Sequence, residues 1–277
     1  MSELVTVAHP AADACAGLTF AERDDLWKAA CILADSRGLL TRIAEYVGGK
    51  GEWIGRRTGG LAVRVFGRNW QARVQDITEG ALWRGYDMAT VGMEGVGGRQ
   101  PRMWFNKAMA GLSGAAGGFF GMPGLAFDIP ASTMMIMRSI AEIARANGED
   151  ITTEPGKIAC LEVFALGGPG MKDDEAEVGY WSTRAAMNHA TVGTAIQFVS
   201  RTFGLVLSEK LLAQAVPVAG AVAGSTLNVL FMDFYQQMAR VHFTIRRLER
   251  TAADPASIRP CFDRLVAEAR GRRKRRT

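Results

Sequence analysis

The chain has 277 residues, of which 48% are hydrophobic and 22% charged, and its net charge is +5. A mean hydropathy of +0.03 is high for a soluble protein but low for a polytopic membrane protein, and the length allows a substantial buried core. Only 9 prolines interrupt the sequence, so long unbroken stretches favour an all-α fold and argue against an all-β one.

The chain begins without a basic stretch followed by an apolar one, so we predict no secretory signal and expect an intracellular, cytoplasmic protein. The cysteines lie far apart and form no Cys-x-x-Cys pair, which fits neither a zinc site nor a disulfide framework, so all are expected to be reduced thiols. The histidines lack metal-binding spacing too, and we expect no metal ion and no cofactor. These residues are Cys15, Cys31, Cys160, Cys261, His9, His189 and His242.

The first predicted helix follows Thr19, whose side chain can form a capping box with Glu22, and it ends near Ala34. Apolar residues at helical spacing predict further helices at 38–67 and 69–93. A glycine-rich stretch, 95–101, is expected to be a loop.

The centre of the chain contains two stretches without a charged residue, 108–127 and 211–232. Each has the length that crosses a bilayer, about 20 residues. Pro123 and Pro217 interrupt them, however, and a core helix can have the same length. Glycines recur in both at intervals of three or four residues, which permits close helix contact. We therefore predict that the two segments pack together, in lipid or in a protein core.

Asp128 followed by Pro130 predicts a capped helix start, and this helix should run to about Ala146. Later in the chain we predict a helix end at 147–150, an acidic loop at 167–177 and two amphipathic helices at 228–250 and 255–270. His242 lies on the apolar stripe of the first of these helices and is interpreted as a core residue rather than a ligand.

The sequence contains incomplete versions of two functional motifs, a phosphate-binding loop and a serine nucleophile motif. The glycine-rich run lacks the Gly-Lys-Ser or Gly-Lys-Thr ending of a phosphate-binding loop. The Gly-x-Ser-x-Ala sequence around Ser113 lacks the strand-to-helix turn that exposes a serine nucleophile. Neither nucleotide binding nor serine hydrolysis is predicted.

Charged residues beside apolar segments are the candidates for a polar site, because a charge in a low-dielectric environment must be paired or serve a function. Asp128 lies between two uncharged runs, and Arg138 and Glu142 have the spacing of an intrahelical pair. The structural interpretation is that Asp128 caps its helix and that the pair is closed. Asn228 can hydrogen-bond across helices and so specify register. Arg184 can stack on the aromatic residues before it or bridge to the acidic loop.

The chain ends in a basic run: Arg270, Arg272, Arg273, Lys274, Arg275 and Arg276. Such a run attracts anionic lipid headgroups, at about 1 kcal/mol per residue, or nucleic-acid phosphates without sequence preference. The alternative is a solvated, disordered end. Interleaved aromatic residues and a nucleic-acid module are missing, so we do not expect nucleic-acid binding.

Several motifs follow one another between about residues 70 and 250. They are a glycine-rich run before Asp-Ile-Pro at 128–130, Met-Arg-Ser-Ile-Ala-Glu-Ile-Ala at 137–144, Asn-Gly-Glu-Asp at 147–150, Leu-Glu-Val-Phe-Ala-Leu-Gly-Gly at 161–168, an acidic loop, Gly-Tyr-Trp-Ser-Thr-Arg at 179–184 and Val-Pro-Val-Ala-Gly-Ala-Val-Ala-Gly-Ser-Thr-Leu-Asn at 216–228. In this order they make the chain resemble the EcsC family.

The resemblance implies a helical protein linked with membranes. The family takes its name from a protein encoded alongside the components of an ABC transporter, so such components are candidate partners. Some members carry a peptidase description, which no motif of this chain supports. Carried over to this sequence, the motif residues that form the candidate polar site are Asp128, Arg138, Glu142, Asp150, Glu162, Tyr180, Arg184 and Asn228.

We expect a single compact all-α domain in which the two glycine-rich segments pack together. Its parts are an amino-terminal extension (1–68), an EcsC-like domain (69–250), and a terminal helix with the basic tail (251–277). The expected function is non-enzymatic: association with anionic lipid at the inner face of the cytoplasmic membrane, peripheral or partly inserted, as an accessory to a transport or envelope process. The alternative is a lipid or peptide hydrolase, which requires Asp128, Glu162 and Arg184 to converge on an open pocket.

Overall fold

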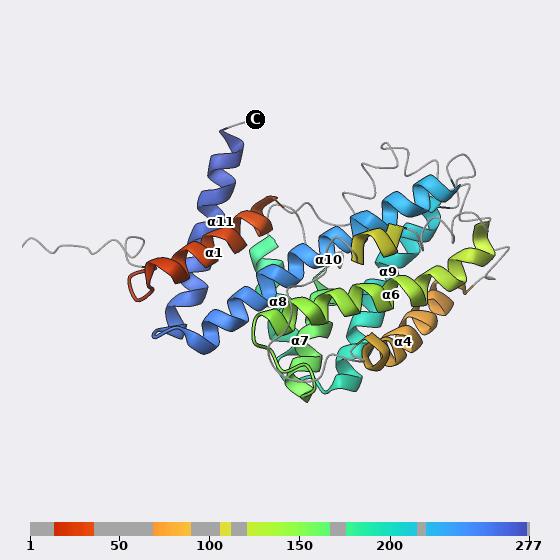
Figure 1. Cartoon of the computed structure of the whole chain (residues 1–277), viewed down its shortest axis with the longest axis horizontal. Coiled ribbons are helices and arrows are strands. Elements are labelled where there is room, and N and C mark those ends of the chain that lie inside the picture. Colours follow the sequence, from red (N-terminus) through yellow and green to blue (C-terminus); the bar gives the residue numbers. More distant parts are fainter. Residues whose placement is uncertain are drawn as a thin grey trace, which may run out of the picture.

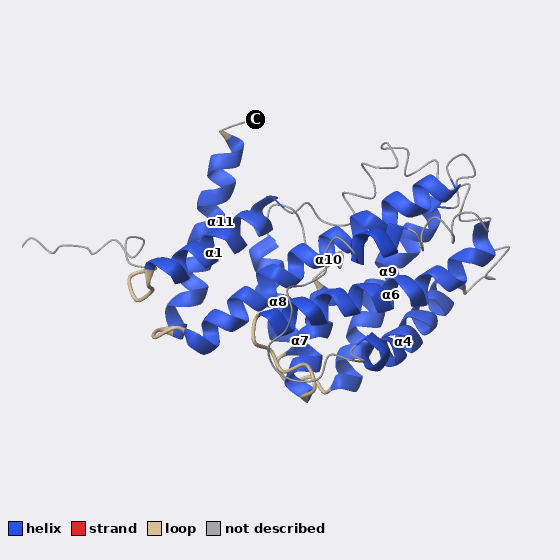
Figure 2. Ribbon diagram, in the orientation of Figure 1, coloured by secondary structure: helices blue, strands red, loops and turns tan. Residues whose placement is uncertain are grey.

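The computed structural model of the chain describes residues 14–35, 69–89, 106–111, 121–166, 176–214 and 220–275. Within these ranges every regular element is a helix, which confirms the predicted all-α fold (Figure 2). The helix predicted at 38–67, the loop at 95–101 and most of the acidic loop at 167–177 lie outside the described residues.

The elements, in chain order, are α1 (Phe20–Asp35), α4 (Trp70–Ala89), α6 (Gly121–Ala146), α7 (Glu154–Ala165), α8 (Ala176–Met187), α9 (Val192–Gln214), α10 (Gly220–Thr251), the 3-10 turn η2 (Pro255–Ser257) and α11 (Ile258–Lys274). Residues 106–111 add a helical segment. The 32-residue α10 runs along the molecule, with α6 and α9 packed against it, α4 packed on α6 and α9, and α1 and α11 beside its carboxyl-terminal end (Figure 1).

The core forms around α10 because its apolar residues recur at helical spacing and so share one face. Phe231, Phe234 and Met238 on this face are buried. Tyr235 contacts Phe164 of α7 and Phe203 of α9, with ring centroids 5.2 and 5.6 Å apart. Aromatic pairs in such geometry add to the stabilisation from apolar burial, so this cluster joins three helices at the centre of the molecule.

The predicted start of the central helix at Asp128 is wrong. The helix α6 begins at Gly121, so Asp128 lies two turns inside it and Pro130 is an interior proline. A proline there removes one backbone hydrogen bond, at a cost of about 3 kcal/mol. The contacts of α6 beyond Pro130, where Ile136, Met137 and Ile140 are buried, offset this local cost. The predicted end is right, since Gly148 follows the helix with a φ of +76° that suits glycine.

The two uncharged segments meet at Asn228, which hydrogen-bonds to the backbone of Ala110. The structure does not describe the surroundings of most glycines in these segments, so their predicted close contacts stay a prediction. Among the described residues, no helix combines the length and the apolarity needed to span a bilayer.

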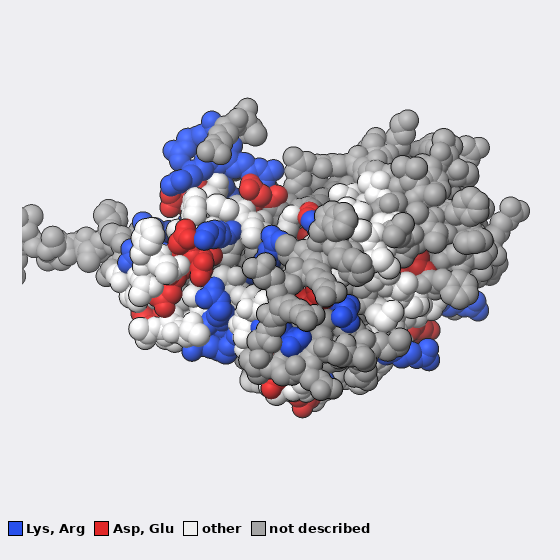
Figure 3. All heavy atoms as spheres, in the orientation of Figure 1, with Lys and Arg blue, Asp and Glu red and all other residues white. Residues whose placement is uncertain are grey.

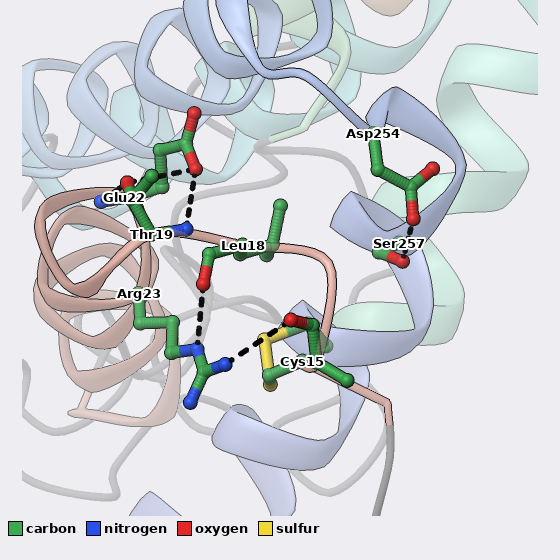
Figure 4. The surroundings of a disulfide bond; sticks show 9 residues. Cys15, Leu18, Thr19, Glu22, Arg23, Asp254 and Ser257 are labelled. Atoms are coloured by element: carbon green, nitrogen blue, oxygen red, sulfur yellow. Dashed lines mark hydrogen bonds between the residues drawn. A yellow bond between two sulfur atoms is a disulfide. The ribbon is translucent and has the colours of Figure 1, made fainter.

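The amino-terminal helix α1 begins as predicted. The backbone N–H of Thr19 donates to the Glu22 carboxylate at 2.7 Å, and the Glu22 N–H donates to the Thr19 hydroxyl at 3.3 Å. Arg23 then donates to the carbonyl of Leu18 at 3.1 Å (Figure 4). Because the capping box and Arg23 bind the chain just before α1, the preceding turn has a defined position relative to α1.

The expectation that all cysteines are free thiols is wrong for Cys15 and Cys261, which form a disulfide (Figure 4). The two residues are 246 positions apart, so no local spacing could indicate the bond. The turn before α1 also approaches Asp254 so closely that a Cβ on Gly17 would lie 2.5 Å from the carboxylate, which requires glycine there. The disulfide therefore joins two segments from opposite ends of the sequence that already pack together.

Replacing Cys15 with serine should lower the free energy of unfolding by about 2–4 kcal/mol, because the disulfide restricts the unfolded chain over a long loop. Urea unfolding without reductant measures this change. The matched control is Cys31→Ser, which removes a free, half-buried thiol of α1. A thiol titration of the denatured, unreduced protein should detect Cys31 and Cys160 alone. Four titratable thiols would rule out the bond.

Candidate functional site

Polar side chains link α6 and its following turn to α10 along the length of both helices. Asn228 donates to Asp128, Gln236 donates to Ser139, and farther along Arg246 donates to Glu149. Residue numbers increase together on the two helices, so they run parallel. Each contact fixes the same register, and a shift by one residue would leave buried polar groups without partners.

The first of these contacts confirms that Asn228 hydrogen-bonds across helices. Its side-chain amide donates to Asp128 Oδ1 at 2.8 Å and to the carbonyl of Ala110 at 3.1 Å. Asp128 is 4% exposed and Asn228 is 2% exposed. A buried carboxylate needs such donors, so this contact holds α6, α10 and the 106–111 segment together.

A second polar group lies where α7, α8 and α10 meet. The Tyr180 hydroxyl is 3.3 Å from His242 Nδ1, and Glu162 Oε2 is 3.1 Å from His242 Nε2. The Glu162 contact is close but poorly aligned as a hydrogen bond, since neither of its two atoms has a well-oriented partner among the described residues. A neutral imidazole with its proton on Nε2 suits both neighbours, accepting from Tyr180 and facing the carboxylate.

Burial dominates the protonation of this group. It lowers the pKa of His242, because the imidazolium loses its hydration and the nearby carboxylate does not compensate. Burial alone raises the pKa of Glu162, but the contact with His242 and the positive charges of Arg246 and Arg184 outweigh it and lower that pKa. Burial raises the pKa of Tyr180 far above its ordinary value. At neutral pH the group is therefore a carboxylate beside a neutral imidazole and a neutral phenol.

Arginine–carboxylate pairs surround this group. Arg184 donates to both oxygens of Glu249, at 2.8 and 2.9 Å. Its guanidinium also lies 5.3 Å from the ring centroid of Trp181, which confirms the predicted stacking. Glu149, only 7% exposed, accepts from Arg246 and Arg250. Such bidentate contacts have the geometry that guanidinium and carboxylate groups favour. Each charge is therefore neutralised by its partner.

The remaining predicted site residues lie apart from this group. Glu142 is 3.6 Å from Arg138 on α6, the predicted intrahelical pair, and it also accepts from Asn106 at 2.9 Å. Asp150 accepts from the N–H and hydroxyl of Thr152 in the turn before α7, and these bonds lower its pKa. Glu142 therefore also joins α6 to the 106–111 segment, whereas Asp150 stabilises a local turn.

The structure does not bring Asp128, Glu162 and Arg184 to one open pocket. Their partners on α10, Asn228, His242 and Glu249, are spread along that helix. Asn228 and His242 are 14 residues apart, which is about 21 Å at 1.5 Å per residue. His242 has no exposed surface, so it cannot contact a substrate in this conformation. The arrangement that a hydrolase requires is not found among these residues.

Sequence reasoning missed the partners that complete the group: His242 in its polar role, Glu149, Arg246 and Glu249. One signal was present, because His242, Arg246 and Glu249 follow one another at helical spacing on α10. A row of ionisable residues beside an apolar stripe indicates buried ion pairs. The sequence does not show which residues of α7 and α8 pair with this row, because tertiary packing determines those contacts.

The basic end of the chain belongs to α11 as far as Lys274, so a disordered end is wrong for Arg270–Lys274. Arg272 pairs with Glu268 at 2.7 Å and lies over the Trp27 ring at 4.7 Å. Arg273 donates to the carbonyl of Ala34 at 3.0 Å. Because a cation at a helix carboxyl terminus is favourable, α1 holds the basic end in place. Arg276 lies outside the described residues.

The described residues contain no group of three or more histidine, cysteine or acidic side chains placed to hold a metal ion. Among the comparisons with known proteins, a model of the EcsC protein family matches residues 69–248. No curated protein matches the chain. No solved structure matches it either. The match contains α4 to α9 and all but the last turn of α10, while α1 and α11 lie outside it.

The buried imidazole predicts an acid-sensitive fold. The folded-state pKa of His242 lies below its ordinary value of 6.5, so below pH 6.5 the unfolded chain binds more protons than the folded one. The free energy of unfolding should therefore fall as the pH decreases from 7 to 5. Glu162, whose folded-state pKa is also lowered, extends the loss to lower pH.

The measurement is urea unfolding at several pH values for the wild type and for His242→Gln. The substitution should flatten the pH dependence between 7 and 5, whatever it does to stability at pH 7. His189→Gln, at an exposed position, is the matched control and should keep the wild-type slope. An unchanged slope in His242→Gln would contradict the role assigned to this residue.

Proposed function

The chain belongs to the EcsC protein family, and from this premise we propose that it is a peripheral membrane protein that binds anionic lipid through the basic end of α11. We place this binding at the inner face of the cytoplasmic membrane. There the protein acts as an accessory to a transport or envelope process, with ABC transporter components as candidate partners. The observation that carries the proposal is the position of the basic residues on a protruding helix end.

The carboxyl end of α11 extends beyond the end of α1 and beyond the other helices (Figure 1). Lysine and arginine side chains gather over this half of the helix (Figure 3). Arg270, Arg272, Arg273 and Lys274 lie within its last two turns, and Arg275 follows. Consecutive helical positions point in different directions, so the end presents positive charge on more than one side.

The attachment of α11 to α1 limits the entropy lost on binding. Arg272 lies against Trp27, and Arg273 binds the last turn of α1 at Ala34. At the other end of the same helix pair, Gly17 in the turn before α1 packs against Asp254, which lies just before α11. A positioned cationic surface loses less conformational freedom on docking than a disordered tail does. This supports a surface contact rather than an inserted segment.

The disulfide is relevant to the proposed location. Disulfides persist in oxidising compartments and are rare in the cytosol. At the inner face of the membrane, Cys15 and Cys261 would therefore be reduced. Rapid alkylation of intact cells followed by a thiol count of the purified protein distinguishes the two cases, because an oxidised pair would move the proposed site of action to an oxidising compartment.

Replacing Lys274 and Arg275 with glutamine should weaken binding to vesicles that contain phosphatidylglycerol roughly 30-fold, from about 1 kcal/mol for each lost charge. Co-sedimentation at low ionic strength measures the affinity. The matched control is Arg73→Gln with Arg201→Gln, which removes the same charge from exposed positions on α4 and α9.

Wild-type binding should weaken as salt concentration increases and should be lost on neutral phosphatidylcholine vesicles. The control variant should bind like the wild type. Equal losses in the two variants would mean that net charge, rather than the end of α11, determines binding. Binding that resists high salt would contradict a peripheral contact.

A further inference from the structure

A groove of about 630 Å³ lies between α4 and α6, which pack side by side (Figure 1). Its volume falls within the range of small-molecule sites, about 300–1,000 Å³. Ile77 and Ala81 of α4 and Met134 of α6 form an apolar lining. The exposed residues Asp76 and Arg84 also line the groove, so it opens to solvent.

The hollow exists because α4 carries glycine where it faces the groove. Among the described residues, a Cβ on Gly80 would meet no atom within 4 Å, and one on Gly85 would meet only the Met134 Cα at 3.8 Å. Neither residue has a positive φ. Each glycine costs a helix up to about 1 kcal/mol relative to alanine. Neither backbone geometry nor helix contact requires these two glycines, and what they provide is space.

The two charged residues give the groove a polarity. Asp76 and Arg84 are eight residues apart on α4, which places them about 12 Å apart along the helix axis. Within the described part of the chain, neither forms an ion pair or a side-chain hydrogen bond. An arginine without a partner offers two parallel donors to a carboxylate. Asp76 at the other end repels a second anionic group.

We propose that this groove binds a free long-chain carboxylate, with the hydrocarbon chain along Ile77, Ala81 and Met134 and the carboxylate on Arg84. The ligand is a fatty acid that enters from water. An extended apolar floor with a guanidinium at one end matches one chain with one anionic group. The site is independent of the proposed membrane contact, because it uses other helices and other residues.

The test is calorimetric titration of the full chain with laurate, which is soluble as a monomer. Gly80→Leu should weaken laurate binding at least about tenfold, because the new side chain occupies the groove. Its fold should be retained, since the Cβ meets nothing and leucine favours helix. Arg84→Gln should weaken laurate binding about tenfold but leave dodecanol binding unchanged, because only the carboxylate uses the guanidinium.

Gly271→Leu is the matched control, since Gly271 is also helical, lies on α11 and has no atom of the described part of the chain within 4 Å of an added Cβ. It should bind laurate like the wild type. Three outcomes would overturn the proposal: no binding of laurate by the wild type, equal binding by wild type and Gly80→Leu, or tighter binding of dodecylamine than of laurate. Vesicle binding by Gly80→Leu and Arg84→Gln reports separately on the membrane contact, so failure of one proposal is distinguishable from failure of the other.

Discussion

The need to pair buried polar and charged groups along α10 is the constraint on which the rest of the structure depends. This helix carries Asn228, Gln236, His242 and Arg246 on or beside its buried face. Leaving any such group without a partner costs about 1–3 kcal/mol, and more for a charge. Their partners come from α6, α7, α8 and the turn after α6, so the pairing requirement specifies both the neighbours of α10 and their register. Apolar burial alone would tolerate several packings.

The same constraint explains why the candidate polar residues that the structure describes form no open site. Glu162 and Tyr180 face the two ring nitrogens of His242 in the core, and Arg184 is held by Glu249. A buried ion pair contributes little net stability, but removing one partner is costly because it leaves a charge in a low-dielectric environment. We therefore interpret these residues as determinants of a specific packing. The two surfaces that we propose to be functional lie elsewhere, at the end of α11 and between α4 and α6.

Local interactions were predictable from the sequence, and distant ones were not. Thr19 with Glu22 and Arg138 with Glu142 are separated by three and four residues, and helix geometry alone places each pair together. Asn228 was identifiable as a cross-helix donor because an amide in an apolar segment needs a partner. Its partner Asp128 was instead assigned to a helix cap, because Asp-Ile-Pro is a typical helix start. The sequence does not reveal that tertiary packing stabilises α6 as one helix with Pro130 in its interior. The disulfide and the groove depend on contacts between distant segments. Neither the cysteine spacing nor the glycine content shows which segments come together.

The positions of the two proposed surfaces bear on how they can act together. The basic end of α11 lies at one end of the molecule, whereas α4 and α6 lie toward the other (Figure 1). The helix α10, which runs between them, is about 48 Å long at 1.5 Å per residue. The Debye length at physiological ionic strength is about 8 Å, so charge at the α11 end does not affect a carboxylate at Arg84. A protein docked through α11 would therefore hold the groove away from the lipid surface, where it can take up a chain from solution but cannot extract one from the bilayer. Coupling between the two surfaces would require a change in the packing along α10, and the ion pairs of that helix oppose such a change.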